Sequence, residues 1–210
     1  MSTDTLKTGI ISLAALQAGD RAEFSRLVEN TSDMLYRLAL RMLGSPQDAE
    51  DVVQETYLKA LRSLPKFEGR SSLNTWLYRI AMNEVLMMLR KRKPEAFFIE
   101  DKEENDDEGF SKPYQIVDWC CLPEKELLSE ETRKFIDAAI ERLPPKLRSV
   151  LLMRDIEKMS IQQTAEALEL SESAVKTRLL RARLKMREEL SEYFADKIDP
   201  ELSMKDEQAI

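Results

Sequence analysis

Apolar residues recur every three or four positions over most of this chain, the spacing that places them on one face of an α-helix. Over residues 12–43 the pattern fits two helices, with a break either at Gly19–Asp20 or around Asn30–Thr31–Ser32. Ser45–Pro46 then predicts the start of a third helix, over about 46–63, with serine as N-cap and proline at the first helical position. We therefore expect the N-terminal part of the chain to be helical.

The predicted third helix has an apolar face and an acidic face. Its inward stripe is predicted to comprise Ala49, Val52, Val53, Thr56, Tyr57, Ala60, Leu61 and then Leu64. Most polar helix faces are simply solvated, but the acidic half of this one could dock on a basic partner. The residues concerned are Asp48, Asp51, Gln54 and Glu55. Asp48 is also the third helical residue, where its carboxylate meets the positive end of the helix dipole.

The stretch from Phe67 to Lys93 combines a glycine-containing polar loop, an apolar helix and a terminal basic run. The packing face of this helix is predicted to be Leu77, Ile80, Ala81, Val85 and Met88. A second set of residues at helical spacing is polar, and a buried helix does not need it. This set is Ser72, Thr75, Arg79, Asn83 and Arg90. Trp76 shares the side of Leu73 and Ile80, so we assign it to the core.

Residues 99–109 contain seven acidic residues and one lysine, a composition from which no packed core can be made. We interpret 94–126 as a flexible acidic linker between two small helical domains. The predicted organisation is a first domain over 11–93, the linker, a second domain over 127–195 and a C-terminal tail over 196–210.

The second domain has the pattern of a helix-turn-helix. Ser160 and Gln163 predict a capping box that begins a short helix, and Glu169–Ser171 forms a three-residue turn before a longer helix. Outward positions of the longer helix are Ser173, Lys176, Thr177, Leu180 and Arg181, flanked by Arg178, Arg183, Lys185 and Arg187. Six of the twelve residues over 176–187 are basic and none is acidic. Such side chains can pair with base edges and phosphates, so we predict a DNA-reading helix.

Composition narrows the possible functions. The 210 residues include five glycines and abundant Leu, Ala, Glu, Lys and Arg, which predicts an all-α fold. No apolar run approaches about 20 residues and no signal-peptide pattern is present, so we expect a cytoplasmic protein without membrane insertion of its own. The net charge of −7 is unevenly distributed, and therefore does not exclude a nucleic-acid partner.

The chain has no histidine, and Cys120 and Cys121 are its only cysteines. The usual Cys/His metal sites and histidine-dependent nucleophilic catalysis cannot be assembled from one such chain. Because a phosphate-binding glycine loop and a paired-carboxylate motif are also missing, we expect no enzyme activity, no cofactor and no metal. The cysteine pair is interpreted as reduced thiols in a loop.

Four motifs, taken in order, resemble one protein family. They are DAEDVVQETYLKAL at 48–61, TWLYRIAMNEV at 75–85, ERLPPKLRSVLLMRDIEKMS at 141–160 and SAVKTRLLRARLKMREEL at 173–190. Over about 20–192 the chain is similar to group 4 sigma factors of bacterial RNA polymerase, the extracytoplasmic-function (ECF) type of the sigma-70 family. Members of this family retain the second and fourth sigma domains, joined by a linker.

The resemblance implies a transcription initiation factor that binds polymerase core, directs it to promoters through −10 and −35 elements, and assists melting. Asp48, Asp51, Gln54 and Glu55 would then bind the clamp of the largest subunit, and the second domain would contact the flap of the second largest. Duplex −35 DNA would be read by Ser173, Lys176, Thr177, Arg178, Leu180 and Arg181. The linker would thread through the catalytic cleft and RNA exit path, and an anti-sigma factor is an expected partner.

The loop and helix over 67–93 match the part of the family that binds the −10 element as a single strand, with one base flipped into a pocket. That pocket maps onto Phe67, the Arg70–Asn74 loop and Asn83, with the basic run on the backbone. The implied −10 contacts are Phe67, Arg70, Ser71, Ser72, Asn74, Arg79, Asn83, Arg90, Lys91, Arg92 and Lys93.

Some positions depart from the family pattern. Many relatives have glycine where this chain has Lys158 and Glu169, and a left-handed Glu169 would cost about 1–2 kcal/mol. Ser173–Ala174 replaces the commoner glycine–threonine at the start of the recognition helix. Two alternatives remain at this stage: a standalone helix-turn-helix regulator that binds duplex operators, and a sigma-mimicking protein that sequesters an anti-sigma factor.

Overall fold

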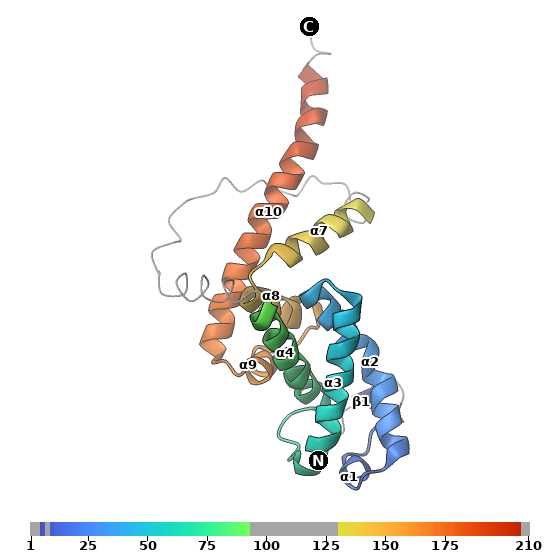
Figure 1. The fold of residues 1–210 in the computed structure, drawn as a ribbon. Coiled ribbons are helices and arrows are strands. Elements are labelled where there is room, and N and C mark those ends of the chain that lie inside the picture. The colour runs from blue at the N-terminus through green and yellow to red at the C-terminus, as the bar shows by residue number, and fades with distance from the viewer. Residues whose placement is uncertain (1–4, 7–8, 93–129, 207–210) are drawn as a thin grey trace.

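The computed structural model describes residues 5–6, 9–92 and 130–206, and within these ranges the fold is all-α apart from one short strand pair. The helices are α1 (Leu13–Gln17), α2 (Arg21–Leu43), α3 (Pro46–Ser63), α4 (Leu73–Arg92), α7 (Glu130–Arg142), α8 (Pro145–Leu151), α9 (Ile161–Leu168) and α10 (Glu172–Asp206) (Figure 1). A 3-10 turn, η1 (Leu64–Lys66), follows α3, and a π-helical segment, η3 (Leu152–Ile156), follows α8. The strands β1 (Thr5–Leu6) and β2 (Gly9–Ile10) pair antiparallel.

The first helical break lies at Gly19–Asp20, the first of the two predicted positions. Gly19 has φ +82°, and the Asp20 carboxylate caps α2 by accepting the amides of Ala22 and Glu23. Thr31 lies inside α2, where its hydroxyl donates to the Leu27 carbonyl at 2.7 Å. A polar residue can thus be buried within a helix by bonding back to the previous turn.

Helix α3 begins and ends as predicted, but its inward stripe is narrower. Ser45 is the N-cap, Pro46 is the first helical residue, and Pro65 lies in the 3-10 turn that follows the helix. The fully buried members of the stripe are Ala49, Val52, Thr56, Ala60 and Leu64. Leu61 was predicted to point inward and is instead 51% exposed, because it follows Ala60 by 100° around the helix and reaches the edge of the buried face.

The assignment of Trp76 to the core is confirmed, since Trp76 is 4% exposed. Thr75 was predicted on the polar face but is only 2% exposed. Its amide donates to the Ser72 hydroxyl at 3.1 Å, and the two hydroxyls are 2.9 Å apart. Ser72 therefore acts as a cap at the start of α4, and Thr75 is drawn into this capping contact.

The predicted helix-turn-helix is formed by α9, the turn over 169–171 and α10. Both halves of the capping box between Ser160 and Gln163 are present. Glu169 ends α9 in the left-handed conformation with φ +55°, and Lys158 has φ +57°. These are the two positions where glycine is common in the resembling family, so this chain carries non-glycine residues in a conformation that favours glycine.

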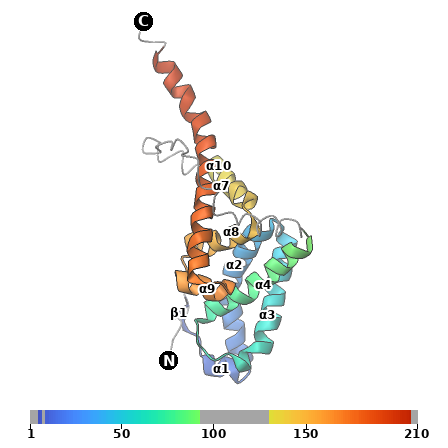
Figure 2. The same ribbon diagram turned by 90° about the vertical axis from the view of Figure 1, so that its left-hand side faces the viewer.

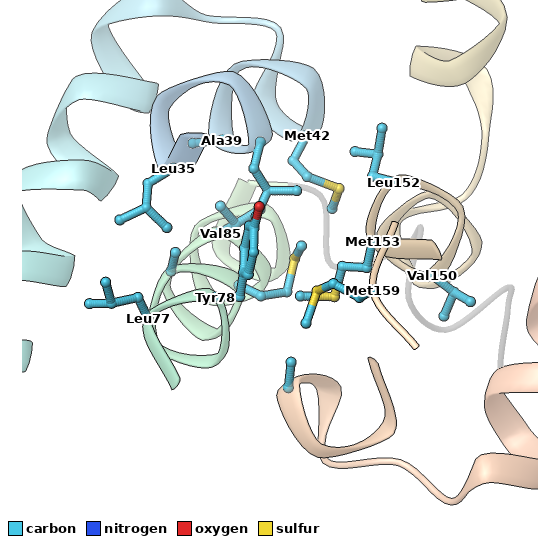
Figure 3. Close-up of a cluster of buried hydrophobic side chains, with 14 of the residues drawn as sticks. Leu35, Ala39, Met42, Leu77, Tyr78, Val85, Val150, Leu152, Met153 and Met159 are labelled. Atoms are coloured by element: carbon cyan, nitrogen blue, oxygen red, sulfur yellow. The ribbon is translucent and has the colours of Figure 1, made fainter. Parts of the chain in front are cut away.

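The two helical regions pack against each other around a continuous core. Helix α4 packs on α9, and α2 contacts both α7 and α8. Met42, Met153 and Met159 converge with Tyr78 and Val85 where the regions meet (Figure 3). The flexible adaptable side chain of methionine fills irregular gaps between such elements. The predicted linker lies outside the described residues.

Two polar contacts also join the regions. The Tyr78 hydroxyl donates to the Glu157 carboxylate at 2.5 Å, and burial together with this neighbour raises the pKa of Tyr78. The Arg148 guanidinium donates to the Met42 carbonyl at 2.9 Å, and also to the carbonyls of Glu141 and Leu143. Arg148 thereby binds carbonyl oxygens at the C-terminal ends of both α2 and α7.

Candidate nucleic-acid and polymerase interfaces

The first turns of α10 present one open face beyond the helix-turn-helix turn. Ser173, Lys176 and Thr177 are exposed, and Leu180 is 56% exposed. Val175, Leu179 and Ala182 anchor the opposite side of the helix in the core. Arg178 and Arg181 lie at the edges of the open face and are partly buried. The described structure therefore brings the six predicted −35 residues to one helix, with four of them exposed.

Not every basic residue of α10 belongs to that face. Arg183 donates to both carboxylate oxygens of Asp155, at 2.9 and 2.6 Å. This bidentate pair joins η3 to α10 and lowers the pKa of Asp155. Arg142 donates through two of its nitrogens to one carboxylate oxygen of Glu189, at 2.8 and 2.5 Å, and so joins α7 to α10. The sequence predicted Arg183 as a flanking cation, and its pairing is visible only in the folded chain.

The predicted −10 loop leaves the core at Phe67 and enters α4 at Ser72. Phe67 is only 8% exposed, and its ring packs on Trp76 with centroids 4.7 Å apart. The structure thus places Phe67 in the core and not in an open base pocket. Arg70 is 83% exposed at its side chain and pairs with Glu68 at 2.5 Å. Asn74 Oδ1 is buried without a hydrogen-bond donor within the described part of the chain.

Asn83 is exposed on α4 and lines a shallow pocket of about 250 Å³ between α3 and α4. The other lining residues are Lys59, Arg62, Ser63, Ile80 and Glu84. Lys59 bridges the two helices through a 2.5 Å ion pair with Glu84. The structure therefore brings Asn83 beside cations of α3 that the sequence reasoning did not single out, and does not bring it beside Phe67.

One residue of the basic run at the end of α4 forms an ion pair with an acidic residue of α3. Arg90, Lys91 and Arg92 are exposed, and Lys93 lies outside the described residues. Arg92 donates to both oxygens of Asp48, one of them at 2.5 Å. The Arg92 hydrogen bonds, together with the Ser45 hydroxyl, lower the pKa of Asp48 to about 2. One candidate DNA-binding residue is thus bound to one candidate polymerase-binding residue.

Replacing Arg92 with glutamine is expected to return the pKa of Asp48 from about 2 toward the ordinary 3.8. Because the folded-state pKa lies below the unfolded value, the pair stabilises the fold above about pH 4, and the stabilisation is lost as the pH falls toward 2. NMR titration of the Asp48 carboxyl carbon measures the shift. Lys91→Gln is the matched control, and an unchanged Asp48 titration in Arg92→Gln would contradict the assignment.

The outer face of α3 carries the remaining polymerase-binding candidates. Asp51 and Gln54 are exposed, and Glu55 is partly exposed with Lys59 3.8 Å away. Leu58 and Leu61, at 48% and 51% exposure, continue the line of Asp51 and Gln54 along the helix. The sequence reasoning missed these leucines as surface residues, although the spacing of 51, 54, 58 and 61 would have placed them on one face.

The described residues contain no cluster of three or more Cys, Asp or Glu side chains that could hold a metal ion, and Cys120 and Cys121 lie outside them. Within the same residues, no helix is both long and apolar enough to cross a membrane.

Two family models match separate parts of the chain. The Sigma-70 region 2 family model matches residues 27–95, and the Sigma-70 region 4 model matches residues 136–186. The first match contains α3 and α4, and the second contains the helix-turn-helix.

Similar curated proteins are ECF sigma factors. The chain is 35% identical over 175 residues to the ECF RNA polymerase sigma factor SigW of Bacillus subtilis, covering 83% of this chain and 92% of the relative. It is 34% identical over 171 residues to the ECF RNA polymerase sigma-E factor of Haemophilus influenzae, covering 80% and 87%. The chain therefore belongs to the ECF sigma factors of bacterial RNA polymerase, which are non-enzymatic transcription initiation factors.

Solved structures share the fold. One is CnrH in complex with the cytosolic domain of CnrY, with a TM-score of 0.60 and 24% identity over 85% of this chain and 94% of that chain. Another is the sigma factor RpoE in complex with the anti-sigma factor NepR from Bartonella quintana, with a TM-score of 0.57 and 24% identity over 80% and 97%.

Proposed function

We propose that this chain binds polymerase core through α3 and reads promoter DNA through α4 and α10. The observation that carries the proposal is the open face of α10: Lys176, Thr177 and Leu180 are exposed together directly after a helix-turn-helix turn. This arrangement offers a cation, a hydroxyl and an apolar contact to a major groove. The −35 element is the duplex that this face would read, with Ser173, Arg178 and Arg181 at its margins.

The polymerase-binding surface is proposed to be the outer face of α3. This face offers polar and acidic contacts from Asp51, Gln54 and Glu55. It also offers exposed apolar area from Leu58 and Leu61, which a bound partner would remove from solvent. This mixture fits a helical partner with basic and apolar side chains, and we assign it to the clamp of the largest subunit. Asp48 is already paired with Arg92, so its contribution is proposed to be mainly internal.

The −10 surface is proposed to comprise the exposed loop residue Arg70 and the partly buried Ser71, with Asn83, Arg79, Arg90 and Lys91 of α4. Ser72 would support the loop at its entry into α4, where its hydroxyl accepts the Thr75 amide. Phe67 would meet a base only if its ring left Trp76. A flipped base would be unstacked at a cost of a few kcal/mol, which polar contacts on this surface would offset.

Further partners are proposed by analogy with the solved relatives, which are complexes with CnrY and with an anti-sigma factor. We propose that an anti-sigma factor binds this chain and holds it inactive, and that the second domain contacts the flap of the second-largest subunit. We also propose that the protein acts in the cytoplasm, where these partners would meet it.

The test is reconstitution of transcription on genomic DNA with bacterial polymerase core and the full chain. Sequencing the 5′ ends of the transcripts is expected to reveal shared −10 and −35 elements, which core alone does not select. A chain that fails to associate with core would overturn the proposal. High-affinity, sequence-specific binding to duplex DNA without core would indicate a standalone regulator instead.

A further inference from the structure

Helix α1 lies at the same end of the bundle as the connection between α3 and α4 (Figure 2). It packs against η1, the 3-10 turn that begins this connection. The segment 67–72, which we call the −10 loop, then runs from Phe67 to the cap of α4 at Ser72. Helix α1 is far from this loop in sequence, and the helical pattern of the chain did not connect the two.

Two contacts join α1 to the −10 loop. The Gln17 side-chain amide donates to the Phe67 carbonyl at 2.7 Å. Leu13 lies against Gly69, since a Cβ added to this glycine would come within 3.3 Å of Leu13 Cδ2. Gly69 also has φ +69°, a conformation that glycine adopts without strain. The loop therefore follows a path that favours glycine at position 69 and is bounded by α1.

Helix α1 is itself held firmly enough to act as a support. Ile11 and Leu16 are 4% and 3% exposed, so both flanks of the helix are anchored in the core. The Ser12 amide donates at 2.5 Å to Glu23 of α2, and Glu23 is only 8% exposed. A chain of contacts thus leads from α2 through Ser12 and Gln17 to the loop.

From this geometry we infer that Gln17 and Leu13 are positioning residues for promoter reading. They set the path of the −10 loop so that Arg70 and Ser71 meet the melted strand in a defined arrangement. The inference rests on the proposed −10 role of the loop, and it adds α1 to the parts of the chain that determine base discrimination. Neither Gln17 nor Leu13 is required to touch DNA.

Gln17→Glu tests the hydrogen bond, because it keeps the shape of the side chain and replaces the donor with an acceptor facing the Phe67 carbonyl. We expect discrimination between the promoter found by reconstitution and single-base −10 variants to fall about three- to tenfold, the effect of one net hydrogen bond. The measurement is the rate of open-complex formation by holoenzyme on each promoter. Ala14→Gln, at an exposed position of α1, is the matched control.

Gly69→Ala tests the second contact, and the double variant Gly69→Ala with Leu13→Ala separates crowding from backbone strain. Discrimination in the double variant is expected to be higher than in Gly69→Ala alone but lower than in the wild type. Removing Leu13 relieves the crowding of the added methyl group but not the strain of the positive φ. Core binding and the melting temperature are measured in parallel.

The outcomes separate two kinds of failure. If wild-type holoenzyme shows no −10 preference, the proposed function of the loop is wrong. If wild-type holoenzyme discriminates and Gln17→Glu discriminates equally well, α1 does not position the loop. The inference would also be overturned if Gln17→Glu lost discrimination and at the same time bound core more weakly or melted at a lower temperature than the wild type. Such a result would indicate a structural role alone.

Discussion

Replacing Arg148 with alanine is expected to lower the free energy of unfolding by about 3 kcal/mol and to loosen the contact between the two helical regions. Its guanidinium donates to the carbonyls of Met42, Glu141 and Leu143, so the substitution removes several charge-assisted hydrogen bonds at once. Hydrogen bonds to charged groups contribute about 1.5–3 kcal/mol each, and part of the loss is recovered when water reaches the carbonyls.

Urea denaturation measures the stability change, and small-angle X-ray scattering measures the radius of gyration of the free protein. Arg133→Ala, which removes an exposed arginine from α7, is the matched control and should leave both quantities unchanged. An Arg148→Ala protein with wild-type stability and dimensions would show that this contact does not hold the regions together.

The Arg148→Ala variant also tests whether the packed arrangement is needed for promoter reading. The −10 and −35 elements are named for their positions and so lie about 25 base pairs apart. This corresponds to about 85 Å of duplex at 3.4 Å per base pair. In this structure α9, which directly precedes the recognition helix, packs on α4, so the two proposed reading surfaces cannot span that distance. The packed arrangement must therefore open for both elements to be read, and Arg148→Ala holoenzyme is expected to retain promoter selectivity.

Replacing Lys176 and Arg181 together with alanine is expected to reduce transcription from promoters that depend on the −35 element by about a hundredfold. Each good contact between a basic side chain and a base edge is worth about 1–3 kcal/mol of discrimination, which is roughly tenfold or more per residue. Both residues lie on the proposed reading side of α10, and neither lies on the outer face of α3. Affinity for polymerase core should be unchanged.

Run-off transcription on promoters with matched and scrambled −35 elements measures this dependence, and a holoenzyme assembly assay measures core binding. Arg187→Ala is the matched control, because Arg187 is an exposed cation farther along the same helix. Equal loss of core binding in the double variant would mean that the reading face of α10 has been misassigned.

Local features of the sequence predicted many of the elements correctly. Serine caps at Ser45 and Ser160, the turn before α10, and the break at Gly19–Asp20, which was one of two predicted positions, depend on residues within four positions of each other. The assignment of Trp76 to the core followed from helical spacing alone. These predictions held because backbone capping and amphipathic spacing act over one or two helical turns.

The proposed interfaces depended more on tertiary structure. Periodicity marked polar faces, but it did not show that Arg92 is bound by Asp48 or Arg183 by Asp155. Nor did it show that Phe67 stacks on Trp76 or that Leu61 reaches the surface. Each of these outcomes depends on where neighbouring helices lie, which is set by packing between segments distant in sequence.

The sequence by itself thus determined the family, the helical elements and the helix-turn-helix, because these follow from short motifs and local spacing. Only the tertiary structure decided which candidate side chains remain exposed, that α1 contacts the loop over 67–72, and that the two helical regions share a core. The physical reason is that burial and ion pairing are properties of surfaces brought together in space, such as Arg148 on the end of α2, and no local pattern encodes their partners.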